Sequence, residues 1–240
     1  MVQHLSSVTN NIAVVTVSPG AILTPWRDAT GVRGIVSAFM PGQEYGGALC
    51  DVMFGDVYPS GRLPITFPET SNDMNITTSQ WPGLPGRDPN TGTIDDNELS
   101  TYSEKLEVGY RYYDAHNITP AFPFGHGLSY TTWHYSGLTV TPKSVKFTLK
   151  NAGQRDGTEV VQMYLGFPLS AGEPPKILKG FRHIQLKAGD ATDVLFALDD
   201  RSKSVWDVSK HGWTVAKGNF RVYVGASSRD VRLTGSFQQT

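Results

Sequence analysis

The residues best suited to catalysis are three carboxylic acids in or near one predicted helix: Glu44, Asp51 and Asp56. Glu44 is the strongest candidate because it lies where a helix begins just after a strand, at the edge of an α/β sheet where ligands usually bind. A carboxylate in the first turn of a helix is also stabilised by the helix dipole, without any catalytic role. Asp51 lies on another helix face and Asp56 beyond the helix end. We favour the dipole interpretation and keep Glu44 as the one catalytic candidate.

The other reactive side chains favour structural roles. His126 lies between two glycines with no Ser or Cys nucleophile motif around it, so we expect a structural histidine bonded to the backbone. Arg62 is expected to anchor an ion pair, with a sugar-hydroxyl contact as the alternative. The six histidines form no HExxH motif, and Asp95, Asp96 and Glu98 lack the spacing of a calcium loop. The sequence therefore predicts no metal site and no cofactor.

Aromatic side chains are concentrated between Tyr102 and Tyr135. Flat rings stack on sugar faces, which gives this cluster a carbohydrate-binding interpretation. The alternative is that the rings join two folded bodies, because aromatic side chains bury large areas at interfaces. We favour the second interpretation for most rings and keep Trp81 and Tyr113 as carbohydrate-binding candidates. The rings considered are Tyr110, Tyr112, Tyr113, Phe122, Phe124, Trp81 and Trp133.

An α/β layer is predicted for residues 1–70. Ile12–Val17 and Ile35–Phe39 are short runs rich in β-branched residues, as expected for strands buried on both faces of a parallel sheet. A helix is expected to open at Pro41-Gly42 and to end at Gly55, where a left-handed cap fits. Its apolar residues fall at i, i+3, i+4, i+7 and i+8; they are Tyr45, Ala48, Leu49, Val52 and Met53.

This predicted layer is too small to bury itself. Two strands and one helix cannot cover both faces of a parallel sheet, so a strand edge and an apolar face stay open. We expect the second body of the chain, another copy, or a larger parent protein to cover them. Because an isologous pair is the commonest closed solution, we predict a homodimer, or another association, through this truncated α/β edge.

Residues 71–131 are predicted to connect two bodies. Asn, Asp, Thr, Gly and Pro dominate residues 71–100, so we expect a surface loop of low intrinsic order. The aromatic stretch that follows has neither a helical nor a strand period. We therefore predict an ordered connector wedged between the bodies on its two sides.

Residues 132–240 are predicted to form an antiparallel β-sandwich, because short alternating segments are separated by Gly, Pro, Asn or Asp. The single Cys50 excludes the antibody-type disulfide and leaves the fibronectin type III-like arrangement. The fold class predicted is mixed α+β: a partial three-layer α/β sandwich segment joined to an immunoglobulin-like (fibronectin type III-like) sandwich. The expected strands are His134–Val140, Val145–Lys150, Val160–Leu165, Ile177–Leu186, Thr192–Ala197, Trp213–Val215, Phe220–Val224 and Val231–Phe237.

Charge and hydropathy exclude several partners. The chain has 21 Lys and Arg against 22 Asp and Glu, a net charge of -1, and no basic cluster for nucleic acid or an anionic membrane. No apolar run approaches the roughly 20 residues of a membrane span, and the N-terminus lacks a signal-peptide pattern. Sequons at Asn75 and Asn117 would be glycosylated only in a secretory compartment. We therefore expect an extracellular protein derived from a secreted parent.

Several long motifs resemble one enzyme family. GYRYYD followed by PAFPFGHGLSYTTW is similar to the junction that leads into the fibronectin type III-like domain of the family three glycoside hydrolases, above all the fungal and bacterial beta-glucosidases. SPGAILTPW and MPGQEYGGALCDVMFGDVYPSGRLPITFPE resemble the end of the family's α/β sandwich domain. EVVQMYLGFP, EPPKILKGFRHIQLKAGD and GNFRVYVGASS resemble strands of its third domain.

The resemblance implies an enzyme that releases terminal β-D-glucosyl residues, but it covers only the rear of such an enzyme. In the family, the aspartate nucleophile lies in an N-terminal barrel domain and the glutamate acid/base lies earlier than the position of Met1. Retaining hydrolysis needs both carboxyl groups, about 5–5.5 Å apart. We therefore transfer no catalytic residue to this chain.

Three functions stay open. The first is a non-catalytic C-terminal segment that scaffolds the active-site domains of a beta-glucosidase. The second is a stand-alone carbohydrate-binding (lectin-like) or interaction module, with β-glucosides or glucan as ligands. The third is an active beta-glucosidase, either through recruited carboxylates such as Glu44 or as part of a longer chain.

Overall fold

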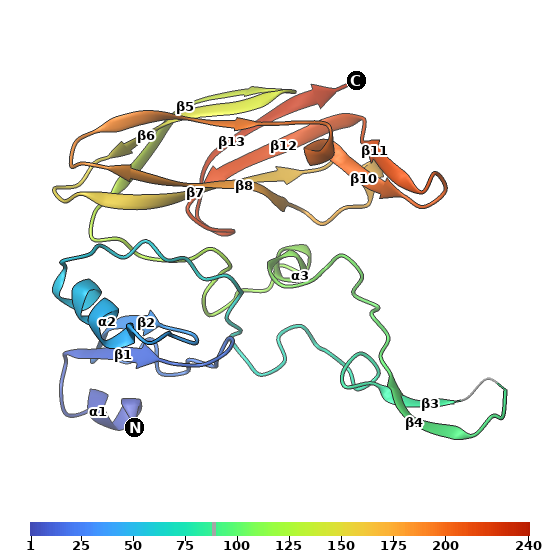
Figure 1. Ribbon diagram of the computed structural model, residues 1–240, viewed down its shortest axis with the longest axis horizontal. Helices are drawn as coiled ribbons and strands as arrows, with labels where there is room; N and C mark the ends of the chain where they lie inside the picture. Colours follow the sequence, from blue (N-terminus) through green and yellow to red (C-terminus); the bar gives the residue numbers. More distant parts are fainter. Residues whose placement is uncertain (88–89) are drawn as a thin grey trace.

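The computed structural model describes residues 1–87 and 90–240, which form two bodies and an extended segment between them (Figure 1). The β-sandwich runs from β5 (Trp133–Thr141) to β13 (Val231–Gln239). The first strands and helices lie below it in Figure 1, and a β-hairpin projects away from both bodies. This architecture confirms the predicted mixed fold of an α/β segment joined to an antiparallel sandwich.

Two antiparallel sheets enclose the core of the sandwich. One sheet has the strand order β13-β12-β7-β8 and the other has the order β5-β6-β9. Because successive side chains of a strand point to opposite faces, Val145, Phe147 and Leu149 enter the core from one sheet, and Phe220 and Val222 enter it from the other. The remaining strands are β6 (Ser144–Asn151), β7 (Gly157–Gly166), β8 (Ile177–Leu186), β9 (Ala191–Ala197) and β12 (Gly218–Gly225).

Strand β7 is buried on both faces. Val161, Met163 and Leu165 belong to the sandwich core. The intervening Gln162 and Tyr164 contact the connector, through a hydrogen bond to the Gly125 carbonyl and a ring contact with Tyr110. The connector therefore covers the outer face of the four-stranded sheet at its centre.

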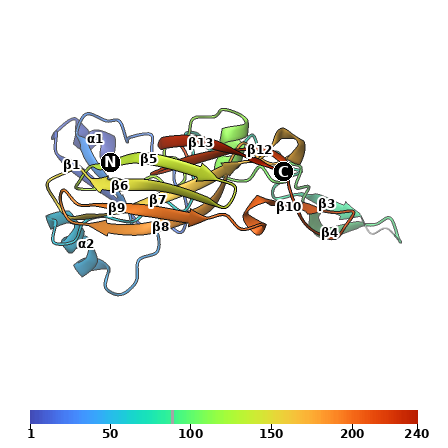
Figure 2. The same ribbon diagram turned by 90° about the horizontal axis from the view of Figure 1, so that it is seen from above.

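One strand of the sandwich region was not predicted. β10 (Ser204–Asp207) pairs with β11 (Gly212–Val215) as a separate two-stranded sheet at one end of the sandwich, seen beside the C-terminus in Figure 2. Only the second strand of this hairpin was expected. Two 3-10 turns, η1 (Leu169–Ala171) and η2 (Arg201–Lys203), complete the connections in this region.

The first body consists of α1 (Val2–Ser6), the parallel pair β1 (Ile12–Thr16) and β2 (Val32–Ser37), and α2 (Tyr45–Phe54). Helix α2 begins at Tyr45, three residues later than expected from Gly42, and Gly55 caps it in the left-handed conformation at φ 88°. The expectation that both strands are buried on both faces is wrong. Every residue of β1, β2 and α2 keeps at least part of its surface exposed, because this two-stranded sheet has no further strand beside it.

Regular structure also occurs where none was expected. The predicted surface loop contains β3 (Leu84–Arg87) and β4 (Ile94–Leu99), paired antiparallel, and the connector contains α3 (Tyr110–Ala115). A helix of six residues is too short to show an amphipathic period, which explains why the pattern missed it. The predicted domain boundaries at residues 70 and 131 stay predictions.

Candidate functional site

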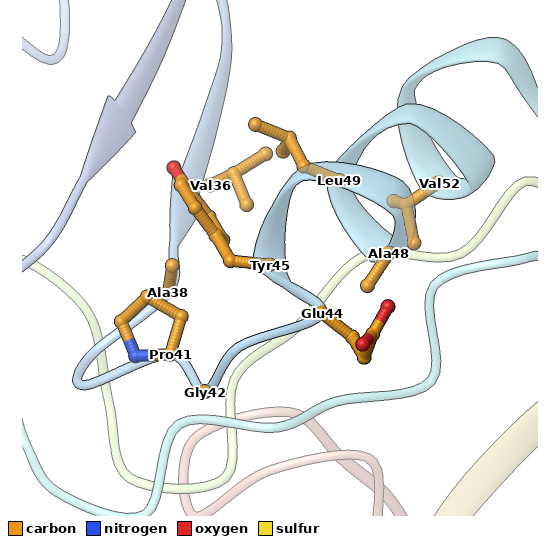
Figure 3. A pocket seen from close by; sticks show the side chains of 9 residues that line it. All are labelled: Val36, Ala38, Pro41, Gly42, Glu44, Tyr45, Ala48, Leu49 and Val52. Carbon is orange, nitrogen blue, oxygen red and sulfur yellow. The ribbon is translucent and has the colours of Figure 1, made fainter.

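The groove between β2 and α2 contains the catalytic candidate Glu44 (Figure 3). The groove has a volume of about 350 Å³ and an almost wholly apolar lining. Glu44 is the N-cap residue of α2, is exposed, and makes no capping hydrogen bond through its side chain. The groove is lined by Val36, Ala38, Pro41, Gly42, Glu44, Tyr45, Ala48, Leu49 and Val52.

This groove holds one carboxylate where retaining hydrolysis needs two. Among its lining residues Glu44 alone is acidic. Asp51 and Asp56 are exposed and do not line the groove. The geometry therefore provides no partner for Glu44 at the separation that a nucleophile and an acid/base require.

A second cavity, of about 480 Å³, lies between residues 64–76 and α3. Its single carboxylate, Asp73, accepts hydrogen bonds from the backbone N–H groups of Glu69 and Thr70 at 2.6 and 2.8 Å and from the hydroxyl of Tyr113 at 3.1 Å. Burial by itself would raise the pKa of Asp73. These three hydrogen bonds, with a fourth from the Thr70 hydroxyl, lower that pKa below its usual value. Asp73 is thus a hydrogen-bond acceptor that holds its loop, and it is poorly suited to proton transfer.

The two carbohydrate-binding candidates have opposite environments. Tyr113 is only 4% exposed, and burial, with the Asp73 carboxylate beside it, raises the pKa of its hydroxyl. Trp81 is 72% exposed and lies at the base of the β3–β4 hairpin. Trp81 is thus accessible to a ligand from solvent, and Tyr113 is almost fully buried. Carbohydrate binding by either residue stays a prediction.

Aromatic rings join the connector to both bodies. Tyr110 stacks on Phe124 with ring centroids 4.8 Å apart, and its hydroxyl accepts a hydrogen bond from the backbone N–H of Leu178 in β8. Phe67, at the end of the first body, meets Phe122 edge to face at 6.1 Å and shares a β-bridge with it. These contacts place the rings between the bodies.

Arg62 makes the ion pair expected of it. Its guanidinium donates to the carboxylate of Glu159 in β7 at 3.0 Å, and the same carboxylate accepts a hydrogen bond from Tyr135 at 3.1 Å. The Glu159 side chain is 2% exposed. Burial raises the pKa of Glu159, more than the positive charge of Arg62 lowers it. A residue from the end of the first body therefore neutralises a charge buried in the sandwich.

A second ionic contact holds α3 against the sandwich. The Asp114 side chain is 6% exposed and accepts from Lys176 at 2.6 Å and from Arg229 at 2.8 Å. Arg229 also donates to the backbone carbonyls of Tyr113 and Ile118. Sequence reasoning identified Arg62 but missed Glu159, Asp114 and their partners, because a single charged residue in a strand or loop carries no signal of burial.

The glycines around His126 explain the FGHGL motif. A Cβ on Gly125, which has φ +81°, would meet the Gln162 side chain, and a Cβ on Gly127 would lie 2.6 Å from the Gly61 carbonyl. The backbone N–H of Leu63 donates to the His126 carbonyl, and the imidazole packs on the Phe122 ring. Burial, followed by the charge of Arg62, lowers the pKa of His126. Close backbone approach at this junction requires the two glycines.

The remaining predicted sites are solvent-facing or untested. Asn75 and Asn117 are exposed, both in the left-handed conformation. Over the described residues, no group of three or more His, Cys, Asp or Glu is arranged to hold a metal ion. The side chains of Asp95, Asp96 and Glu98 lie outside the described residues. No helix of the described chain combines the length and apolar character needed to cross a membrane.

Comparison with known proteins agrees with this architecture. The model of the glycosyl hydrolase family 3 C-terminal domain matches residues 1–130, and that of the fibronectin type III-like domain matches residues 159–228. A probable beta-glucosidase D of Aspergillus niger is 36% identical over 266 residues, covering 99% of this chain and 33% of that protein. The sandwich is therefore of the fibronectin type III-like class, and the chain belongs to the glycosyl hydrolase family 3 C-terminal domain family.

Solved structures extend the likeness to the whole fold. The beta-D-glucoside glucohydrolase of Trichoderma reesei superposes with a TM-score of 0.85 at 34% identity, covering 99% of this chain and 35% of that one. A beta-glucosidase of Streptomyces venezuelae in complex with D-glucose gives a TM-score of 0.87 at 32% identity, covering 100% and 30%. The chain thus spans about a third of the length of these relatives.

Proposed function

We propose that this chain works as the C-terminal part of a beta-glucosidase, where it supports the catalytic body and supplies no reacting carboxylate. The relatives named above are beta-glucosidases and match this chain over nearly all of its length. The observation that carries the proposal is that each of the two cavities described above is lined by a single carboxylate, Glu44 in one and Asp73 in the other. Retaining hydrolysis of a glucoside needs two carboxyl groups facing each other.

The isolated chain is therefore expected to leave a chromogenic aryl β-glucoside unhydrolysed. The assay compares the wild-type chain with Glu44→Gln, which keeps the size of the side chain and removes its charge. Turnover by the wild-type chain that is lost in Glu44→Gln would contradict the proposal and establish a hydrolase with its own carboxylate. Turnover that survives the substitution would contradict it as well and would exclude Glu44 as the source.

The open α/β layer supports a further proposal: the isolated chain self-associates through it. The groove beside α2 is apolar, and Phe54 and Met40 nearby are largely exposed. An apolar surface of this kind marks a contact site. We expect sedimentation of the purified chain at micromolar concentration to show a dimer, and Leu49→Asp to convert it to a monomer.

Leu169→Asp is the matched control for this prediction, because Leu169 is fully exposed on the sandwich, outside the α/β layer. The control is expected to sediment like the wild-type chain. A wild-type chain that is monomeric throughout this concentration range would remove the proposal.

Secretion of the parent protein is part of the proposal, and the two sequons support it. Asn75 and Asn117 are exposed, as a glycosylated asparagine must be. When the chain is expressed with a secretion signal in a fungal host, we expect endoglycosidase treatment to increase its electrophoretic mobility. The double variant Asn75→Gln, Asn117→Gln is expected to show no shift; an unshifted wild-type protein would count against these sites.

A further inference from the structure

The hairpin of β3 and β4 forms part of an arm that projects from both bodies (Figures 1 and 2). The arm comprises residues 79–87 and 90–102, and its two strands form a sheet of their own. An isolated two-stranded hairpin is only marginally stable in water. An arm of this shape therefore gains stability from a surface that it contacts.

The base of the arm is well anchored. The N–H of Trp81 donates to the Thr77 carbonyl, the N–H of Thr101 donates to the Ser79 carbonyl, and the Ser100 hydroxyl donates to the Pro82 carbonyl at 2.8 Å. Two of these bonds join the two segments of the arm at its base, and the Trp81 bond joins the first segment to Thr77 just before it. The base of the arm is therefore closed by hydrogen bonds.

Two leucines on one face of the arm are exposed to solvent. Leu84 and Leu99 are directly opposite in the antiparallel register, so their side chains share a face. They are 50% and 68% exposed, and Trp81 and Tyr102 at the base are exposed as well. Neighbouring apolar side chains that are exposed in this way, here Leu84 and Leu99, mark an interaction surface.

The solved relatives are longer than this chain and offer a partner for this face. The structural likeness extends over 99–100% of this chain, so the residues of the arm lie within the matched part. In those structures this chain corresponds to only 35% and 30% of the polypeptide. About two thirds of each of those polypeptides lies outside the matched part and could contact the segment that corresponds to the arm.

We propose that the Leu84–Leu99 face docks on an apolar surface of the part of a beta-glucosidase that this chain does not span, and so clamps the C-terminal part to the catalytic body. The inference rests on the proposed function and adds to it the contact surface. The partner is protein, and its matching surface is apolar, because the exposed face offers leucine and aromatic side chains.

The test uses the chain alone and a hybrid in which it replaces the aligned third of the Trichoderma reesei enzyme. Amide hydrogen exchange is compared for Leu84, Arg87 and Leu99. In the hybrid we expect these amides to exchange at least about tenfold more slowly than in the isolated chain, because docking stabilises the hairpin against opening. Equal exchange rates in the two proteins would overturn the proposal.

Substitution gives a second readout. The double variant Leu84→Asp, Leu99→Asp is expected to inactivate the hybrid about tenfold faster on heating, because it places charge in the contact. Val208→Asp, at an exposed apolar position of the β10–β11 turn, is the control and is expected to leave the inactivation rate unchanged. An arm variant that behaves like this control would count against docking.

The two proposals fail in different ways. A hybrid that hydrolyses an aryl β-glucoside while its arm amides stay unprotected refutes docking and leaves the proposed function intact. A hybrid with protected arm amides and no turnover refutes the function and supports docking. Protection that appears in the isolated chain only at high concentration would assign the face to a second copy and overturn the proposal.

Discussion

Arg62→Met is expected to lower the free energy of unfolding of the sandwich by about 3–5 kcal/mol, because removing one partner of a buried ion pair leaves the other charge uncompensated. The stranded group is Glu159, whose side chain is 2% exposed and keeps the hydrogen bond from Tyr135. Urea unfolding followed by near-ultraviolet circular dichroism measures the change. Methionine fills the volume of the Arg62 stem, so the loss reports on charge more than on packing.

The loss in free energy of unfolding caused by Arg62→Met is expected to depend on pH. Burial already raises the pKa of Glu159, and loss of the Arg62 charge raises it further. A raised carboxyl pKa means that the folded state holds a proton more readily than the unfolded state, so stability is recovered as the pH falls through the folded pKa. The difference in free energy of unfolding between the variant and the wild-type chain should be smaller at about pH 5 than at about pH 8.

Two controls identify the source of this effect. Adding Glu159→Gln to Arg62→Met removes the stranded charge and is expected to restore part of the stability. Arg27→Met breaks the pair with the more exposed Glu69 and should cost less than about 1 kcal/mol. If Arg62→Met and Arg27→Met shift the midpoint equally, the buried pair does not join the two bodies in the way described.

Asp114→Ala is expected to cost about 3 kcal/mol and to free the connector from the sandwich, because it leaves Lys176 and Arg229 without their shared carboxylate. Trypsin cleavage after Lys105 and Arg111 should then accelerate, since α3 is held to the sandwich partly by these contacts. The unfolding midpoint and the cleavage rate are measured on the same protein.

Asp193→Ala is the control for this second substitution, because Asp193 pairs with Lys146 on an exposed surface of the sandwich. The control is expected to leave both the midpoint and the cleavage rate unchanged. Unchanged cleavage in Asp114→Ala would show that the other contacts of the connector, such as those of Tyr110 and Gly125, hold it in place without this ion pair.

The sandwich was predictable because its signals are local. Strands such as Ile177–Leu186 alternate with turn residues, and this strand was predicted with the bounds that the structure shows. β10 was missed because SVWD has four residues, too few to show an alternating period. The hairpin of β3 and β4 was missed because Pro85 and Gly86 within β3 are typical of loops.

Burial in the first body was predictable only in part. The apolar stripe of α2 and the cap at Gly55 were visible in the sequence, and the open face of the layer followed from the number of strands. The runs of Val and Ile predicted strands buried on both faces, whereas the structure leaves them partly exposed. Such runs are typical of strands in the middle of a larger sheet, and the sheet formed by β1 and β2 has two strands.

Of the candidate site, the sequence predicted the place of Glu44 in the fold and little more. Glu44 could be placed at the start of a helix because strand, turn and apolar stripe follow one another in the sequence. The buried pairs of Arg62 with Glu159 and of Asp114 with Lys176 join residues 97 and 62 positions apart. Such pairs depend on tertiary packing, which no spacing rule in a single sequence reports.

Hydrolysis of an aryl β-glucoside by the hybrid with the Trichoderma reesei enzyme tests the central claim most directly. We expect the isolated chain to show no turnover and the hybrid to hydrolyse the substrate, with turnover retained in the Glu44→Gln hybrid because the reacting carboxylates lie outside this chain. Turnover by the isolated chain, or a folded hybrid that is inactive, would contradict the account.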